Sequence, residues 1–136
     1  MAKISGLGWT ELSIDDAGGS PQDIRNDITN FNFATPRGVQ DVTGIDKSAM
    51  ERLLLLADFS IDISGVFNSA ANMSHAVLST VPSDTTPTRS VTIEIDSQEL
   101  DNECMFTDYA LTRAQSGEFT WSSTGVLSDG EVPTWS

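Results

Sequence analysis

The amino-acid sequence predicts a mainly β fold: a β-sandwich with one short α-helix, in a single domain that spans residues 1–136. Apolar and polar residues alternate along several segments, which is the pattern of strands that bury one face. Clusters of Gly, Pro, Ser and Asp separate these segments and indicate turns. A length of 136 residues is also typical of one domain with one hydrophobic core.

Two strands are predicted in the first third of the chain. Apolar and polar residues alternate in residues 9–15. In residues 24–33 the apolar positions are even up to Ile28 and odd from Phe31 onwards. An extra residue in a strand reverses its inward parity in this way, so we expect a β-bulge or a bend near residues 29–30.

Residues 51–67 predict the longest strand. Odd positions from Leu53 to Ile63 are apolar, which assigns them to the core. Leu54 and Leu56 make the beginning of this strand apolar on its other face as well. Such strands are usually covered on both sides. In so small a chain we expect the second cover to come from another subunit, which makes these two leucines a candidate subunit seam.

The remaining segments predict one loop, one helix and several strands. Residues 37–50 have few apolar residues and no period, which indicates a long irregular loop of the kind that often carries function. Residues 69–81 carry apolar side chains at helical spacing, and Pro82 ends the predicted helix. The other expected elements are strands at 91–95, 103–113 and 118–123 and an extended tail at 125–136.

The charge balance disfavours a nucleic-acid-binding protein. Twenty acidic residues face seven basic ones, which gives a net charge of −13, and no two basic residues are adjacent. Such a surface repels the phosphate groups that dominate nucleic-acid binding. Cys104 is the only cysteine, so no internal disulfide can form, and no apolar run approaches the ~20 residues of a membrane span. We expect folding in the cytoplasm and no association with a membrane.

No catalytic or metal-binding pattern emerges from the sequence. Cys104 and His75 are the only candidates for a thiol–imidazole pair, but Cys104 lies in an apolar segment where a buried, inert thiol is expected. Pairs of carboxylates share a strand face, but with twenty acidic residues in the chain such pairs are expected by chance. Gly6 and Gly8 have the spacing of the first two glycines of a dinucleotide-binding motif, but the third glycine of that motif is absent. We therefore predict no enzyme activity, no cofactor and no metal.

A central block of sequence is distinctive, with supporting segments on both sides. The block comprises residues 33–37 (FATPR), 40–49 (QDVTGIDKSA) and 51–58 (ERLLLLAD). The supporting segments are residues 6–16 (GLGWTELSIDD), 23–28 (DIRNDI), 107–113 (TDYALTR) and 130–135 (GEVPTW). Together they cover most of the chain and resemble the major tail tube proteins of long, flexible-tailed (siphovirus-type) bacteriophages.

The resemblance implies a structural virion protein. Proteins of this family form hexameric rings that stack into a hollow tube, and strands from every subunit join an inner β-barrel around the channel through which phage DNA leaves. The implied partners are further copies of the same chain, a tape-measure protein, a tail terminator and baseplate or tip proteins, with DNA passing without specific binding. The implied location is the virion tail, after assembly in the cytoplasm of the bacterial host.

Period-two alternation and the resemblance together suggest three groups of site residues. We expect a carboxylate-lined channel wall formed by Asp58, Asp62, Glu94 and Asp96. We expect the subunit seam at Leu54 and Leu56. For ring-to-ring stacking the candidates lie in the irregular loop: Arg37, Gln40, Asp41, Asp46, Lys47 and Met50.

Three other functions remain open from the sequence. The first is an inner-tube subunit of a contractile tail or a secretion machine with the same fold. The second is a monomeric β-sandwich binding module, which would need clustered exposed aromatic residues. The third is a small hydrolase that uses Cys104 and His75.

Overall fold

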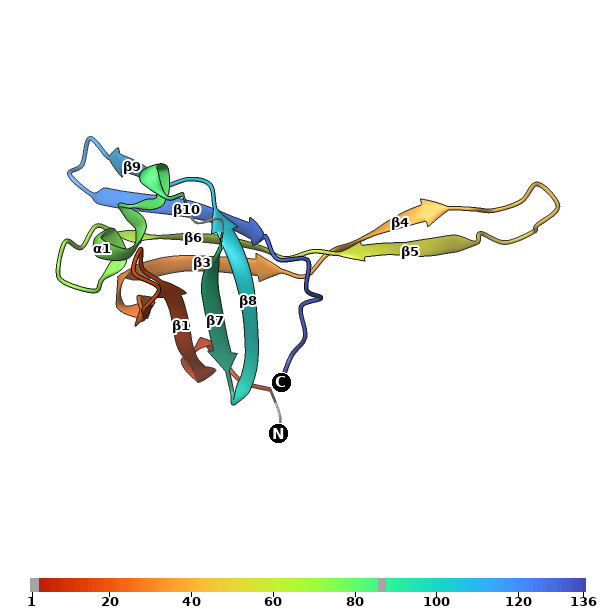
Figure 1. The fold of residues 1–136 in the computed structure, drawn as a ribbon, viewed down its shortest axis with the longest axis horizontal. Helices are drawn as coiled ribbons and strands as arrows, with labels where there is room; N and C mark the ends of the chain where they lie inside the picture. The colour runs from red at the N-terminus through yellow and green to blue at the C-terminus, as the bar shows by residue number, and fades with distance from the viewer. Residues whose placement is uncertain (1–2, 86–87) are drawn as a thin grey trace.

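The structure, a computed structural model, describes residues 3–85 and 88–136. Within these residues an eight-stranded antiparallel sheet forms a body, and a two-stranded antiparallel sheet projects from it (Figure 1). The expected mainly β class is confirmed. The elements are η1 (Gly6–Gly8), β1 (Trp9–Asp15), β2 (Pro21–Asp23), η2 (Arg25–Asp27), β3 (Ile28–Ala34), β4 (Arg37–Asp41), β5 (Arg52–Ala57), β6 (Ser60–Val66), α1 (Ser74–Leu78), η3 (Val81–Ser83), β7 (Arg89–Ile95), β8 (Gln98–Phe106), β9 (Ala110–Arg113) and β10 (Phe119–Leu127).

The large sheet curls until its two halves face each other across the core. Its order is β2-β1-β7-β8-β10-β6-β3, with β9 beside β10. The strands β1, β7 and β8 form one half, and they run across β3, β6 and β10 of the other half in Figure 1. Trp9 in β1 stacks on Phe31 in β3, with ring centroids 4.7 Å apart, although the two strands lie far apart in the sheet order. The two layers of the expected sandwich are therefore two halves of one sheet.

The core lies between these halves and takes buried side chains from β1, β6, β7, β8, β10 and helix α1. Period-two alternation along each strand sends one set of residues inward. The buried apolar residues are Leu12, Ile14, Ile24, Phe59, Ile61, Ile63, Val77, Leu78, Val91, Ile93, Leu100, Cys104, Phe106 and Trp121.

The N-terminal strand predictions are largely correct. Strand β1 covers the predicted residues 9–15. The ladder between β3 and β6 shifts its register between Ile28 and Asn30, which confirms the expected bulge. The first part of the expected strand at 24–33 is wrong, because Arg25–Asp27 form the 3₁₀ turn η2.

The predicted strand at 51–67 is two strands in different environments. Odd residues of β6, such as Ile61 and Ile63, are buried as expected. The same parity in β5 is exposed, and Leu53 and Leu55 contact no core. Strand β5 lies outside the body, where there is no core to bury either of its faces.

A break at Pro36 and Asp58 separates the body from the projecting sheet. Pro36 has no N–H to donate to a ladder. The N–H of Asp58 donates to the carbonyl of Pro36 at 3.0 Å, and the Asp58 side chain accepts the N–H of Phe59 at 2.8 Å. These bonds satisfy the backbone where β3 passes into β4 and β5 passes into β6.

The expectation of an irregular loop over residues 37–50 is wrong for its first part. Residues 37–41 form β4, which pairs with β5 (Figure 1). Beyond β4 the hydroxyl of Thr43 donates to the carbonyl of Glu51 at 3.1 Å and accepts its N–H at 2.7 Å, which continues the ladder. We call residues Arg37–Ala57 the hairpin. Its strands lack an apolar alternation signal because neither face packs on a core.

Three further boundaries differ from the prediction. The helix expected at 69–81 is the five-residue α1, followed by the 3₁₀ turn η3. The strand expected at 103–113 divides into β8 and β9. The tail expected at 125–136 begins later, because β10 runs to Leu127, and its end pairs with β8 through a bridge between Trp135 and Leu100.

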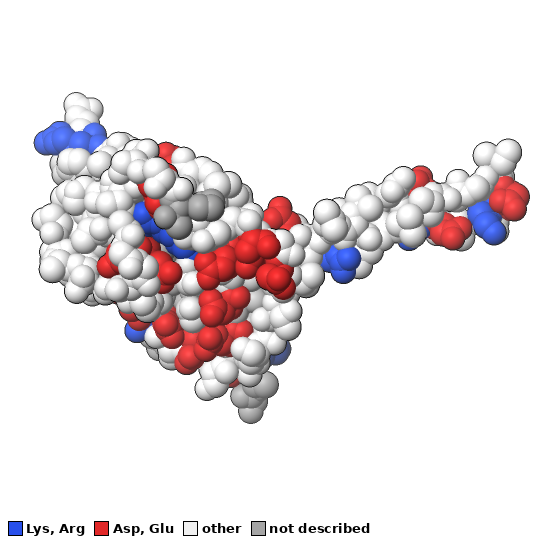
Figure 2. Space-filling view, viewed as in Figure 1, with Lys and Arg blue, Asp and Glu red and all other residues white. Residues whose placement is uncertain are grey.

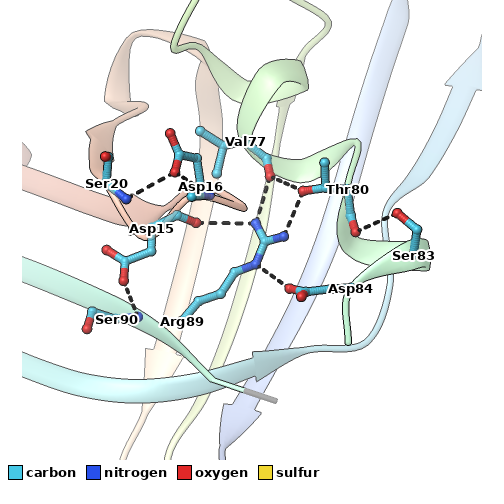
Figure 3. Close-up of polar contacts among 10 residues, drawn as sticks. Asp15, Asp16, Ser20, Val77, Thr80, Ser83, Asp84, Arg89 and Ser90 are labelled. Atoms are coloured by element: carbon cyan, nitrogen blue, oxygen red, sulfur yellow. Dashed lines mark hydrogen bonds and ion pairs between the residues drawn. The ribbon is translucent and has the colours of Figure 1, made fainter. Parts of the chain in front are cut away.

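A buried arginine fixes the helical segment to the sheet (Figure 3). The guanidinium of Arg89 in β7 donates to the carbonyl of Val77 at 2.7 Å, to the carbonyl of Asp15 at 3.2 Å and to the hydroxyl of Thr80 at 2.8 Å. It also forms an ion pair with Asp84 at 3.0 Å. Arg89 is only 4% exposed, so these partners satisfy a cation that is shielded from water.

A close approach between β6 and the turn before β3 requires glycine at position 65. A Cβ atom at Gly65 would lie 1.8 Å from the carbonyl oxygen of Asp27. We expect Gly65→Ala to lower the free energy of unfolding by about 2–3 kcal/mol or to prevent folding, because the backbone must move. Urea unfolding measures this change. Gly6→Ala, where a Cβ meets nothing within 4 Å, is the control and should change stability little. Equal stability of the two variants would contradict the close approach.

Candidate assembly surfaces

The hairpin exposes a long row of apolar side chains. Leu56 is 89% exposed and Ile45, near the tip, is fully exposed. A groove on the hairpin is lined by Leu54–Leu56 with Arg37 and Gly38. The apolar residues of the hairpin that are exposed are Val39, Val42, Ile45, Met50, Leu53, Leu54, Leu55 and Leu56. An apolar surface of this extent is typical of a site of protein association.

The hairpin is neutral, whereas the body is strongly acidic. Three basic and three acidic residues lie within Arg37–Ala57, so the whole net charge of −13 resides in the rest of the chain. Figure 2 shows blue and red side chains interspersed along the hairpin. The hairpin can therefore approach the body of another copy without the repulsion that two bodies experience.

The candidate stacking residues are distributed along the hairpin. The guanidinium of Arg37 donates to the carbonyl of Leu55 at 2.9 and 2.7 Å, and so it fixes the base of the hairpin. Gln40 pairs with Leu53 in the ladder. The N–H of Thr43 donates to the carboxylate of Asp41 at 2.9 Å. The other three candidates lie in the exposed connection beyond the strands: Asp46, Lys47 and Met50.

One outward face of the body is acidic. Carboxylates project from β1, β7 and β8 and gather in front of the body in Figure 2. Glu94 lies opposite Glu99 across the β7–β8 ladder and opposite Glu11 across the β1–β7 ladder. We call this surface the acidic face: Glu11, Glu94, Glu99, Asp101 and Glu103. The last three are not among the residues expected from the sequence, although they alternate with the buried Leu100, Asn102 and Cys104.

The outward face of the other half is polar but nearly uncharged. Asp62 in β6 lies opposite Asn32 of β3 and Thr124 of β10, and the Thr124 hydroxyl donates to its carboxylate at 3.1 Å. A shallow depression crosses these three strands. We call this surface the amide–hydroxyl face: Asn30, Asn32, Asp62, Ser64, Ser122 and Thr124.

The structure does not bring the four candidate channel carboxylates together. Asp62 and Glu94 lie on the outward faces of different halves, and those faces point away from the shared core. Asp58 lies at the break between β5 and β6. Asp96 lies in the β7–β8 turn with a φ of 49°, not on the strand beside Glu94. None of the four side chains is buried in the core.

The thiol and the imidazole do not form a catalytic pair. Burial raises the pKa of the Cys104 thiol to about 12, and its side chain is fully buried. His75 instead contacts the hydroxyl of Tyr109 through Nδ1 at 3.0 Å and packs on Phe67. Across residues 3–85 and 88–136, no group of three or more His, Cys, Asp or Glu side chains is placed to hold a metal ion. In the same residues, no helix has the length and apolar character needed to cross a bilayer.

The fold is shared with chains of phage-like particles. One lies in the virion of a native gene transfer agent particle, with a TM-score of 0.76, 15% identity and a match over 98% of this chain and 99% of that chain. Another lies in the tail of an empty gene transfer agent particle computed with C6 symmetry, with a TM-score of 0.74, 18% identity and 98% of both chains covered. No protein-family model and no curated protein matches. At these identities the likeness shows the fold, which is the fold that the resemblance to phage tail proteins implied.

The environment of Cys104 predicts that it is unreactive. A thiol with a pKa of about 12 is almost entirely protonated at pH 8, and burial also prevents access. We expect no release of thionitrobenzoate from Ellman's reagent by the native protein over an hour at pH 8, and one thiol per chain in 6 M guanidinium. Rapid reaction of the native protein would contradict this placement and reopen the hydrolase alternative.

Proposed function

We propose that this chain is the tail tube subunit of a phage or a phage-like particle. Copies assemble as hexameric rings, the rings stack into a tube, and DNA leaves through its channel. The observation that carries the proposal is the hairpin, which is neutral and apolar and stands clear of an acidic body. The shared fold with a chain of a gene transfer agent tail supports it.

The hairpin needs a partner surface to become stable. An isolated two-stranded sheet is marginal in water. Burial of one leucine side chain contributes about 1.5–3 kcal/mol. Covering Leu54, Leu55 and Leu56 in a neighbouring copy would therefore provide several kcal/mol towards association, before any hydrogen bond is counted. On this proposal, Leu54 and Leu56 lie at the contact between copies.

The position of the hairpin favours a polymer over a closed dimer. It projects from one side of the body, whereas helix α1 and the β9–β10 turn lie on the opposite side (Figure 1). A contact between two different surfaces is heterologous, and such contacts build rings or filaments. The C6 symmetry of the gene transfer agent tail supports six copies in each ring.

The acidic body suits a passage for DNA. Phosphate groups are repelled by carboxylates within a screening length of about 8 Å at physiological salt. A channel wall with fixed negative charge and no basic patch would let DNA slide without binding. Only one of the two outward faces of the body can line such a channel, because the faces point in different directions.

The proposal includes the partners of a tail. A tape-measure protein would fill the channel during assembly, a terminator would close one end, and a baseplate or tip would close the other. Assembly would take place in the host cytoplasm, and the product would be the virion tail. The same fold is also compatible with the alternative function, the inner tube of a contractile tail or a secretion machine. A sheath around the tube would identify this alternative.

The hairpin argues against a monomeric binding module. Such a module needs clustered exposed aromatic residues, but the large exposed surface of the hairpin is aliphatic. The exposed aromatic residues within the described part of the chain are Phe119, in β10, and Trp135, in the C-terminal tail. A monomeric protein would also gain nothing from a projecting apolar hairpin.

Removing the hairpin tests its role in stacking. Arg37 pairs with Ala57, so residues 38–56 can be replaced by Asn-Gly, which forms a two-residue hairpin turn. We expect a folded variant with the circular dichroism spectrum of a β protein that gives subunits or single rings but no tubes. Negative-stain microscopy of the concentrated proteins measures this. Normal tubes from the shortened chain would exclude the hairpin from stacking.

A carboxylate introduced at Leu54 tests whether this residue lies in a contact between copies. Leu54→Asp places a carboxylate in the expected contact, so we expect tube formation to fall at least tenfold while the thermal unfolding temperature changes little. Leu7→Asp is the matched control, because Leu7 is 94% exposed but lies outside the hairpin. Light scattering at equal concentration compares the two. If both variants assemble like the original chain, the seam lies elsewhere.

A further inference from the structure

The β4–β5 ladder contains one extra residue near the base of the hairpin. Between two neighbouring pairs of the ladder, β4 advances by two residues and β5 by three; these pairs are Arg37 with Ala57 and Val39 with Leu54. Leu55 and Leu56 therefore lie opposite the single residue Gly38, which is the arrangement of a β-bulge. A bulge shifts the register of every pair beyond it by one residue and increases the local twist of the strands.

The bulge decides which face of the hairpin carries Leu54. Side chains alternate between the two faces of a strand, so a register shift of one residue moves each side chain to the other face. With the bulge at its observed place, Leu54 lies opposite Val39, and the two side chains share a face. If the extra residue lay nearer the tip, Leu55 would lie opposite Val39 and Leu54 would point to the other face.

Packing within the chain does not hold the bulge in place. The register of a strand is strongly specified where one face is buried and weakly specified where neither face is. Every residue of β4 is exposed, and in β5 only Ala57 is partly buried. The hairpin therefore needs another interaction to fix its register.

The guanidinium of Arg37 supplies this interaction. Its Nε and Nη2 atoms both donate to the carbonyl of Leu55, at 2.9 and 2.7 Å. Leu55 is one of the two residues in the bulge, where the regular ladder is disrupted. Hydrogen bonds from a charged donor are stronger than those between neutral groups, and the planar fork of arginine gives them a fixed geometry.

These two hydrogen bonds are specific to the observed register. The N–H of Asp58 donates to the carbonyl of Pro36, and from this hydrogen-bonded pair the two kinds of pair alternate along the ladder. A ladder that continued without the bulge would place Leu55 opposite Val39 in a non-hydrogen-bonded pair. The backbone groups of such a pair point away from the partner strand, so the Leu55 carbonyl would point away from Arg37.

The pairs beyond the bulge are complementary in the observed register. Val39 lies opposite Leu54, and Asp41 lies opposite Arg52 on the same face. Apolar pairs and pairs of opposite charge both stabilise a two-stranded ladder. Without the bulge, Asp41 would lie opposite Leu53 instead. The observed register therefore presents an exposed apolar pair on a face whose charges are matched.

We propose that Arg37 is a positioning residue: by holding the bulge at the base of the hairpin, it directs Leu54 and Val39 together toward the neighbouring copy. The inference rests on the proposed function, because it gives the exposed leucine a partner in another copy. It also gives Arg37 a role that differs from a stacking contact. The donors that bond the Leu55 carbonyl act within the chain and fix the geometry of the surface that associates.

Disulfide trapping in dilute, unassembled protein measures the register. The N–H of Val42 donates to the carbonyl of Glu51, and three pairs nearer the base Val39 and Leu54 form a non-hydrogen-bonded pair, in which side chains are closest. We expect Val39→Cys with Leu54→Cys to form a disulfide within the chain in high yield. Arg37→Ala in the same background should lower this yield about fivefold or more, which is the shift that one hydrogen bond of ordinary strength gives.

A second cysteine pair detects the shifted register. Val39→Cys with Leu55→Cys should cross-link poorly in the presence of Arg37 and about fivefold better with Arg37→Ala. Lys47→Ala removes the same charge from the exposed connection near the tip and is the matched control, so it should change neither yield. The native Cys104 is buried and does not compete. Equal yields with and without Arg37 would overturn the inference.

Tube formation is measured on chains that keep the native Val39 and Leu54. We expect Arg37→Ala to lower the yield of sedimenting tubes about fivefold or more at equal folded concentration. The thermal unfolding temperature should change little, because the hairpin contributes nothing to the core. Arg37→Lys keeps the charge but not the fork. Across arginine, lysine and alanine at this position, the tube yield should follow the yield of the Val39–Leu54 cross-link.

Three results would contradict the inference and leave the proposed function intact. Tubes restored by Arg37→Lys without the Val39–Leu54 cross-link would show that the residue acts by charge on another copy. Normal tubes from Arg37→Ala with the cross-link lost would show that assembly does not need this register. Lost tubes with an intact cross-link would assign Arg37 to the contact itself. Absence of rings and tubes from the unmodified chain at every concentration would instead overturn the proposed function, and with it this inference.

Discussion

The structure depends on one constraint: two strands that bury a face in the core continue beyond the core. Strands β3 and β6 pack on the body, and after the break at Pro36 and Asp58 their paths continue as β4 and β5. Apolar side chains are therefore buried within one chain in β6 and left exposed in β5. A subunit of this kind is complete in its body and incomplete in its hairpin, and another copy is the simplest cover for the exposed leucines.

Charge separates the surfaces that repel from those that can associate. The body carries the whole net charge of −13, and its carboxylates gather on the acidic face. The hairpin is neutral, because three basic residues match its three acidic ones. The places that can approach another copy are thus the places without uncompensated negative charge. This arrangement keeps free subunits apart while leaving a few orientations in which they attract one another.

The sequence predicts the strands in which apolar and polar residues alternate, because these strands bury one face. Strands without this alternation were not predicted. Strand β1, the bulge in β3 and the buried residues Ile61 and Ile63 follow from alternation against one core. Strand β4 was missed because a strand without a core has no apolar period to read. Most of the acidic face was missed because the strand expected from residue 103 begins at Gln98, so Glu99 and Asp101 were not assigned to a strand. The separation of Asp62 from Glu94 depends on the curl of the sheet, which arises from contacts such as Trp9 on Phe31.

The break at Pro36 has a mechanical consequence. The two strands of the hairpin pair along their length, whereas at the break the N–H of Asp58 donates to the carbonyl of Pro36. The hairpin is consequently supported along its own length but is connected to the body only through the two chain segments at Pro36 and Asp58. Bending of an assembled filament would concentrate at such joints, so each body could keep its packing while the whole length curves.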